Sequence, residues 1–156
     1  MCTCIDNIKV SYSEIGRMTA RATRQSFCKP VASVLGGQPS VNEYLDAVNV
    51  AARELQKVTD SINDLVEIVR NNFCDITPSE ADELLMLSAP VSEKMQALHR
   101  KILRSSIYAG METVVGLYND AMTGFEELCS DLKTWDIDAP DNNHLQQTLE
   151  LLKTIA

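Results

Sequence analysis

The feature that most constrains the fold is a long helical stripe over residues 41–73. Apolar residues recur there in alternating steps of four and three, with one polar member, Thr59. The stripe consists of Val41, Leu45, Val48, Ala52, Leu55, Thr59, Ile62, Val66, Val69 and Phe73, flanked by Tyr44, Ala51, Val58 and Leu65. A stripe this wide predicts a continuous helix of about 50 Å that more than one neighbour covers. We expect Leu45, Leu55, Ile62 and Val69 to be shielded from water.

The segments on either side show the same period. Residues 6–27 predict a first helix, and a loop with Pro30, Gly36, Gly37 and Pro39 follows it. Ser40 and Glu43 form a capping-box pattern at the start of the 41–73 helix. Near the end of the chain, leucines at four- and three-residue steps predict a last helix over about 141–155.

A new helix should begin at Thr77, because Thr-Pro-x-Glu is a helix-start pattern. Thr77 suits the N-cap, Pro78 the first helical position and Glu80 the third. Pro90 should then break or kink this helix, since proline lacks the N–H that a helix interior needs. Ser88 is in place to cap a helix that restarts at Pro90.

The stripes over 91–102 and 114–135 do not join in register. Ser105, Ser106 and Gly110 lie in the gap between them. Such a shift predicts a bend or a break near residues 105–111. We favour one long helix over 91–135 that bends there, with a true turn between two helices as the alternative.

Composition supports an all-α fold. The chain has 156 residues, of which 45% are hydrophobic and 23% charged, which suits one globular domain over 1–156. Six Gly and five Pro are too few for an all-β protein with many tight turns. The expected architecture is a single antiparallel bundle of four to five helices.

Charge falls into four blocks along the chain. Residues 1–35 carry +3, 36–90 carry −7, 91–108 carry +3 and 109–156 carry −7, which sums to −8. The overall negative charge disfavours nucleic-acid binding. Opposite blocks could face each other and help to select helix pairing, or the clusters could simply lie on solvated faces.

The five cysteines and the N-terminus favour a cytoplasmic protein. The thiols at positions 2, 4, 28, 74 and 129 do not resemble a disulfide framework. The first residues show no signal-peptide pattern, and no apolar run approaches a membrane span. Cys2 and Cys4 could be acylated, although a frayed end is the simpler interpretation.

Catalytic and metal-site patterns are weak, so we expect no enzyme, no cofactor and no metal site. His99 precedes Arg100 and Lys101, which would oppose its protonation, and His144 lies at a helix start. Glu80 and Glu83 are spaced as in a magnesium-binding pair, but no second acidic pair completes the motif. Carboxylates in a first helical turn explain them better.

Two basic clusters are candidate binding sites for an anionic partner. Arg17, Arg21 and Arg24 recur at helical spacing in the first helix, and Arg100, Lys101 and Arg104 form the second cluster. Either could bind carboxylates, phosphate or a lipid headgroup. The alternative, which we favour, is pairing within the chain to acidic residues of the next helix, namely Asp46, Glu54, Asp60, Asp64 and Glu67.

A second candidate site is apolar. Met111, Val114, Tyr118 and Met122 lie beside the glycines at 110, 116 and 124, and soft side chains near small residues can line a cavity. Core filling is the more usual role for such residues.

Three functional hypotheses follow. The leading one is a non-enzymatic interaction module of adaptor, regulatory or effector type that binds another protein, with a homo-oligomer open. The second is a carrier that holds an apolar ligand or lipid between helices. The third, although we do not expect a membrane partner, is a peripheral binder of anionic membranes through the Arg17–Arg24 stripe.

Overall fold

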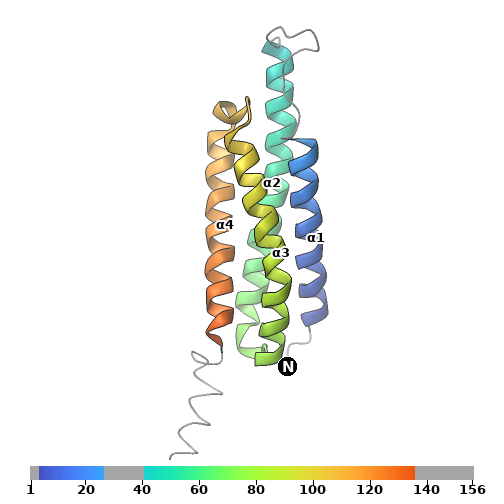
Figure 1. Cartoon of the computed structure of the whole chain (residues 1–156), viewed down its shortest axis with the longest axis vertical. Coiled ribbons are helices and arrows are strands. Elements are labelled where there is room, and N and C mark those ends of the chain that lie inside the picture. The colour runs from blue at the N-terminus through green and yellow to red at the C-terminus, as the bar shows by residue number, and fades with distance from the viewer. Residues whose placement is uncertain (1–3, 27–40, 136–156) are drawn as a thin grey trace, which may run out of the picture.

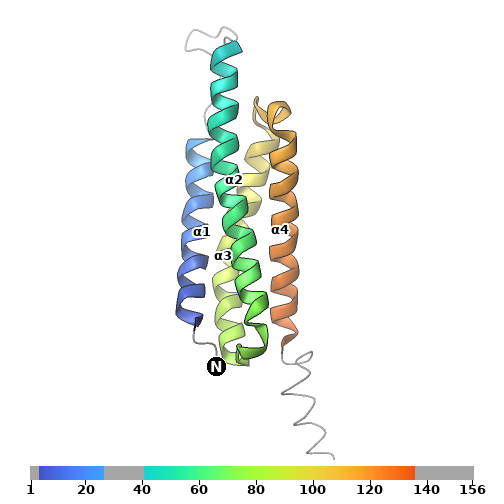
Figure 2. The same ribbon diagram turned by 180° about the vertical axis from the view of Figure 1, so that it is seen from behind.

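The structure, a computed structural model, describes residues 4–26 and 41–135 and contains four long helices in that part of the chain (Figures 1 and 2). The helices are α1 (Ile5–Gln25), α2 (Val41–Asn71), α3 (Pro78–Leu103) and α4 (Glu112–Lys133), with short 3₁₀ turns η1 (Phe73–Asp75) and η2 (Tyr108–Met111). The described segments contain no strand, so the predicted all-α bundle is confirmed. The predicted helix over 141–155 and the cap at Ser40 lie outside the described residues.

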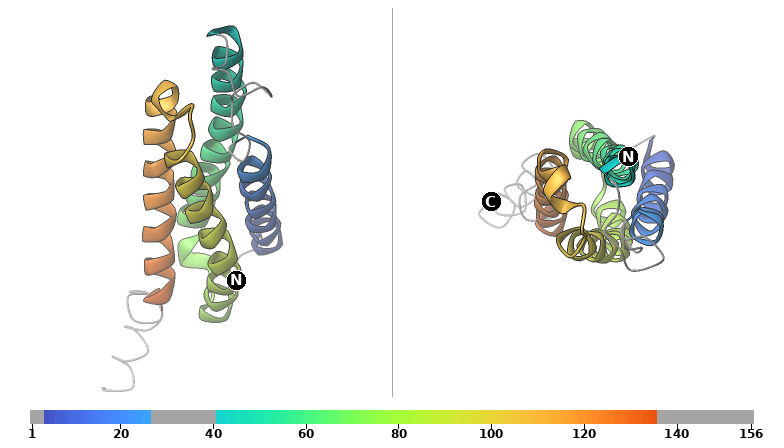
Figure 3. Two further views of the ribbon diagram at one scale, coloured as in Figure 1. Left: turned by 45° about the horizontal axis from the view of Figure 1, so that its top comes forward. Right: turned by 90° about the horizontal axis from the view of Figure 1, so that it is seen from above.

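Consecutive helices run in opposite directions, but the pairs with the closest packing are parallel. α1 packs most extensively against α3, and α2 against α4. Seen from above, the four helices form a square in which α1 lies opposite α4 and α2 opposite α3 (Figure 3, right). The second halves of α1 and α3 therefore lie side by side at one end of the bundle (Figure 1).

The predicted α2 stripe forms one wall of the core. Its members from Val48 onward face the other helices, and Leu55, Ile62 and Val69 are fully buried. Leu45, however, is 49% exposed and Val41 is 74% exposed, so the prediction that Leu45 is shielded was wrong. The physical reason is length: the first turns of α2 extend beyond the ends of α1, α3 and α4, where no described helix covers them (Figure 2).

Three buried polar side chains are satisfied within their own helices. Thr19, Thr59 and Ser88 each donate their hydroxyl proton to the carbonyl oxygen four residues earlier, at 2.7, 2.8 and 2.7 Å. A buried hydroxyl without such a bond would be costly. This bonding explains how Thr59 can occupy a core position in the α2 stripe.

The helix start at Thr77 is confirmed in full. The Glu80 amide donates to the Thr77 hydroxyl at 3.2 Å, and the Thr77 amide donates to the Glu80 carboxylate at 2.9 Å. Pro78 occupies the first turn. Together these bonds satisfy two of the amide groups that a helix start leaves without helical partners.

Pro90 does not break α3, contrary to one of the predicted outcomes. The helix runs through it from Pro78 to Leu103, and Ser88 donates to the Leu84 carbonyl rather than capping a new helix. The carbonyl that loses its donor is that of Met86, four residues earlier. Met86 is 77% exposed, so water can replace the missing N–H.

The join between the last two helices is a true turn, so the favoured single bent helix over 91–135 was wrong. α3 ends at Leu103, and η2 leads into α4. Ile107 and Met111 are buried in this connection. A Cβ on Gly110 would lie only 3.0 Å from a methyl group of Val48 and 3.1 Å from the Tyr44 hydroxyl, so glycine allows the connection to approach α2.

The opposite end of the bundle is closed by an aromatic pair. Phe73 of η1 and Trp135, which follows α4, meet edge to face with ring centroids 4.6 Å apart. Trp135 is 5% exposed. The contact therefore ties the end of α2 to the end of α4.

Candidate binding surfaces

The three arginines predicted on the first helix do share one exposed face. Arg17, Arg21 and Arg24 point away from the core, because the buried residues of α1 follow the opposite phase. Steps of four and three residues keep these three side chains in one row. The row covers the second half of α1.

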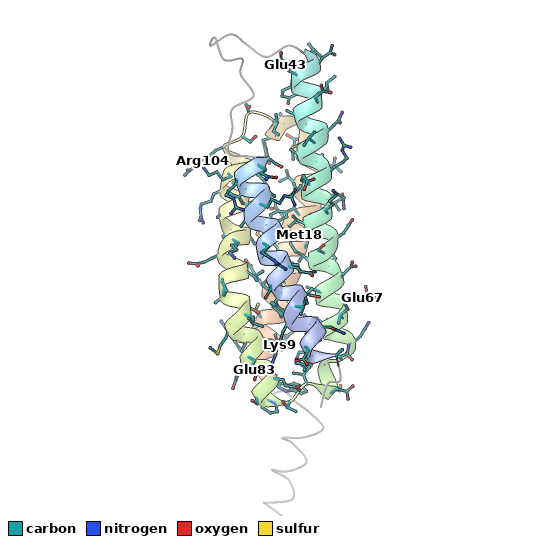
Figure 4. All side chains as sticks on the ribbon, turned by 90° about the vertical axis from the view of Figure 1, so that its right-hand side faces the viewer. Lys9, Met18, Glu43, Glu67, Glu83 and Arg104 are labelled. Carbon is teal, nitrogen blue, oxygen red and sulfur yellow. The ribbon has the colours of Figure 1, made fainter. Side chains whose placement is uncertain are left out.

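The second basic cluster lies at the same end of the molecule. Arg100, Lys101 and Arg104 are exposed on the last turns of α3, next to the helix that α1 contacts most closely. Figure 4 shows Arg104 at the end of α3, level with the end of α1. The parallel arrangement of α1 and α3 thus brings two clusters that lie far apart in sequence to the same end of the molecule, and the exposed surface of α1 and α3 that carries them is here called the basic face.

The favoured pairing of the α1 arginines with the acidic residues of α2 was wrong for the described residues. Ion pairs in this part of the chain join Lys9 to Glu83, Lys57 to Glu54 and Arg70 to Asp131. None of them includes a member of either basic cluster.

Two of the α2 carboxylates instead find partners on their own helix. Glu54 lies 3.5 Å from the Lys57 ammonium, and Asp60 accepts from the Gln56 amide at 2.8 Å. Arg21 likewise donates to the Gln25 side chain of its own helix at 3.1 Å.

Two adjoining hollows mark the surface beside α1: the first lies between α1 and α3, and the second is lined by α1 residues with Lys94 as its one α3 residue. The first encloses about 640 Å³ and the second about 620 Å³. The first is lined by Lys9, Val10, Tyr12, Ser13, Gly16, Arg17, Leu87, Pro90, Val91 and Lys94. The second is lined by Glu14, Arg17, Met18, Ala20, Arg21, Arg24 and Lys94. Because Arg17 and Lys94 line both hollows, we treat them as one groove, called the α1–α3 groove.

The floor of the groove is set by close helix packing at Gly16. A Cβ there would lie 3.6 Å from a Val91 methyl group and 3.4 Å from the Lys94 ammonium nitrogen. The Lys94 side chain therefore extends across α1. Its charge adds to the basic face, although no spacing pattern distinguishes Lys94 in the sequence.

The lower end of the groove is apolar and closed by an ion pair. Val10 is 54% exposed, Pro90 is exposed and Leu87 is half-buried. Below them Lys9 bonds to Glu83 across the two helices (Figure 4). The hydrogen bond that the Lys9 ammonium donates to the Glu83 carboxylate raises the pKa of Lys9.

The carboxylates considered for magnesium have structural partners. Glu80 completes the cap of α3, and Glu83 pairs with Lys9. Within the described residues no three potential metal-ligating side chains gather into a cluster. These observations agree with the interpretation that the two glutamates belong to a helix start.

The described thiol and imidazole groups lie in different surroundings. Burial raises the pKa of Cys129, which disfavours its thiolate. Cys74 is exposed, and His99 is half-buried with its Nδ1 lacking a hydrogen-bond partner. Cys2, Cys28 and His144 lie outside the described residues.

The residues predicted to line an apolar cavity are mostly packed in the core. Met111, Tyr118 and Met122 are buried, and Val114 is half-buried. The Tyr118 hydroxyl donates to the Met95 carbonyl at 2.7 Å. None of these four residues lines the α1–α3 groove, and the carrier hypothesis stays a prediction.

No helix in the described ranges combines the length and the apolar character that crossing a bilayer requires. Comparison of the chain with protein-family models, curated proteins and solved structures found no match. The feature of the described residues that bears on function is therefore the surface of α1 and α3.

Proposed function

We propose that this chain is a non-enzymatic, cytoplasmic interaction module of adaptor, regulatory or effector type that binds an acidic surface of another protein through its basic face. The observation that carries the proposal is the location of seven cationic side chains on neighbouring faces of α1 and α3, without a described ion pair. They are Arg17, Arg21, Arg24, Lys94, Arg100, Lys101 and Arg104.

This placement is not what folding alone would favour. Like charges on adjacent helices repel each other, whereas the acidic residues of α2 would have offered opposite charge. A partner's carboxylates would remove the repulsion and form charge-assisted hydrogen bonds with the arginines. The gain comes on binding rather than on folding, as in a recognition surface.

The net charge of the whole chain favours one orientation of the molecule toward an acidic partner. A molecule with net charge −8 is repelled by an acidic partner unless its basic face turns toward that partner. Long-range forces therefore favour one approach direction. The association rate should fall as salt increases, because screening acts within about 10 Å at 0.1 M ionic strength.

A protein partner fits the shape better than an anionic membrane does. The first hollow of the groove, of about 640 Å³, is concave, and a flat bilayer would leave its apolar side chains without contacts. The acidic remainder of the chain would also be repelled by anionic lipid. A second copy of this chain, which carries acidic residues along α2, is an alternative source of carboxylates.

The test compares two double charge reversals in the full-length chain. Arg17→Glu with Arg21→Glu alters the basic face, and Arg53→Glu with Lys57→Glu makes the same change in charge on exposed positions of α2. Tagged versions are expressed in the cells from which the chain comes, and co-purifying proteins are quantified against wild type. We expect a protein that is lost with the first variant and retained with the second.

The alternatives give different results in the same experiment. A wild-type chain whose solution mass is a dimer, and which the first variant converts to a monomer, would replace the partner with a second copy. Salt-sensitive binding to phosphatidylserine vesicles that the first variant abolishes would indicate a membrane instead. Equal partner recovery with both variants would refute the role of the basic face.

A further inference from the structure

The α1–α3 groove has different chemistry at its two ends. Val10, Leu87 and Pro90 make the lower end apolar. Higher along the same groove, the four cations Arg17, Arg21, Arg24 and Lys94 outnumber the one lining carboxylate, Glu14, and make this end cationic. A ligand that satisfies the groove must therefore be apolar over one part of its length and acidic over the other.

The length of the groove suits a short helix. Its lining on α1 runs from Lys9 to Arg24, which corresponds to about 23 Å of helix. A ligand helix of about 15 residues, or roughly four turns, has the same length. Helices that dock into grooves commonly use a single apolar face of this size.

The walls of the groove favour a helical ligand over an extended one. Both walls are α-helices, whose backbone N–H and C=O groups are bonded within each helix. An extended peptide gains its affinity from main-chain bonds to an open strand edge, and the described residues contain no strand. A helix satisfies its own backbone and needs only side-chain contacts from the groove.

Resting on the function proposed above, we propose that the α1–α3 groove binds an acidic amphipathic helix of the partner protein. Its apolar residues contact Val10, Leu87 and Pro90, and its carboxylates contact Arg17, Arg21 and Lys94. Carboxylates spaced at i, i+4 and i+7 match the spacing of the α1 arginines, so one face of the ligand helix can bond to all three. A ligand helix that has the carboxylates but lacks the apolar residues would bind more weakly. A ligand helix that has the apolar residues but lacks the carboxylates would also bind more weakly.

The probe is a synthetic helical peptide of about 15 residues. One half carries leucines at helical spacing, and the other half carries glutamates at i, i+4 and i+7. A second peptide has the same composition in shuffled order, which removes both faces. Each is titrated into the isotope-labelled full-length chain, and amide chemical shifts report the binding site and the affinity.

Two exposed valines provide a matched pair of variants for the apolar end. Val10 is 54% exposed in the groove, and Val50 is 50% exposed on α2. Val10→Gln should weaken peptide binding about fivefold, as expected when one apolar contact is lost, and Val50→Gln should leave it unchanged. Arg21→Glu should weaken binding about tenfold or more, against no effect for Arg53→Glu.

Amide shift changes confined to the linings of α1 and α3, with binding only by the patterned peptide, would support the proposal. Equal binding by the shuffled peptide would refute it, because charge alone would then explain the affinity. Absence of binding by either peptide, while the basic-face reversal still releases a partner protein from cells, would overturn the helical ligand but keep the proposed function. Absence of both effects would overturn the two proposals together.

Discussion

The two buried tyrosines of the core differ in one hydrogen bond, which allows its energy to be measured. Tyr12 and Tyr118 are both fully buried. The Tyr118 hydroxyl donates to the Met95 carbonyl at 2.7 Å, whereas the Tyr12 hydroxyl has no hydrogen-bond partner. The nearby Ser88 hydroxyl donates to the Leu84 carbonyl instead.

Removal of each hydroxyl should therefore change stability in opposite directions. Tyr118→Phe loses a hydrogen bond with a net value of about 1 kcal/mol. Tyr12→Phe removes a buried polar group without a partner, and we expect the free energy of unfolding to rise by about 1 kcal/mol. The two variants should differ by about 2 kcal/mol, or about 4–8 °C in Tm for a chain of this size.

Urea unfolding followed by far-ultraviolet circular dichroism measures both variants against wild type. Equal destabilisation by Tyr12→Phe and Tyr118→Phe would refute the assignment, since it would mean that the Tyr12 hydroxyl is bonded. A double-mutant cycle with Ser88→Ala would then identify the bond, because a Tyr12–Ser88 interaction would appear as a coupling energy.

The same tyrosine makes stability fall at alkaline pH. Burial raises the pKa of Tyr12 from 10.0 to about 12. Between these values the unfolded chain releases a proton that the folded chain retains, so the free energy of unfolding decreases as pH rises. Tyr12→Phe should reduce this decrease. An unchanged pH dependence in the variant would show that Tyr12 does not cause it.

Three further predictions concern glycine, proline and cysteine positions. Gly116→Ala should stabilise α4 by about 1 kcal/mol, because a Cβ at that position meets nothing within 4 Å. Gly110→Ala should not stabilise the protein, because its Cβ would meet an α2 side chain at 3.0 Å. Thermal unfolding of the two variants distinguishes these outcomes. Pro90→Ala should raise the free energy of unfolding, measured by urea titration, by about 2 kcal/mol, because proline is unfavourable inside a helix. An unchanged free energy of unfolding would mean that α3 is adapted to proline. Cys74 should react with a maleimide faster than Cys129, because Cys74 is exposed and burial raises the pKa of Cys129. Peptide mapping by mass spectrometry measures the order of labelling, and faster labelling of Cys129 would contradict the prediction.

Much of the fold could be predicted from periodicity and capping. The α2 stripe from Val48 to Val69 and the start of α3 at Thr77 follow from local rules, because hydrophobic spacing and caps act within a few turns. The exposure of Leu45 could not be predicted, since it depends on where the neighbouring helices end. Pro90 shows the same limit: whether a helix tolerates proline depends on the exposure of the carbonyl four residues earlier.

The candidate site could be predicted only in part. The spacing of Arg17, Arg21 and Arg24 placed them correctly on one face. Their neighbours could not be deduced, because packing α1 beside α3, rather than against α2 alone, is a choice of topology that no single stripe encodes. Lys94 and Val10 became part of the groove only through that choice.

The contact between Phe73 and Trp135 gives the protein a native optical probe. Trp135 is the only tryptophan of the chain, and its indole is shielded where η1 meets the end of α4. Its emission should therefore shift to longer wavelength when that end of the bundle opens to water. Because the groove runs along α1, which lies opposite α4 in the bundle, peptide binding should leave this emission unchanged. Loosening of the helix ends around Trp135 and ligand binding could thus be followed as separate signals in one unlabelled sample.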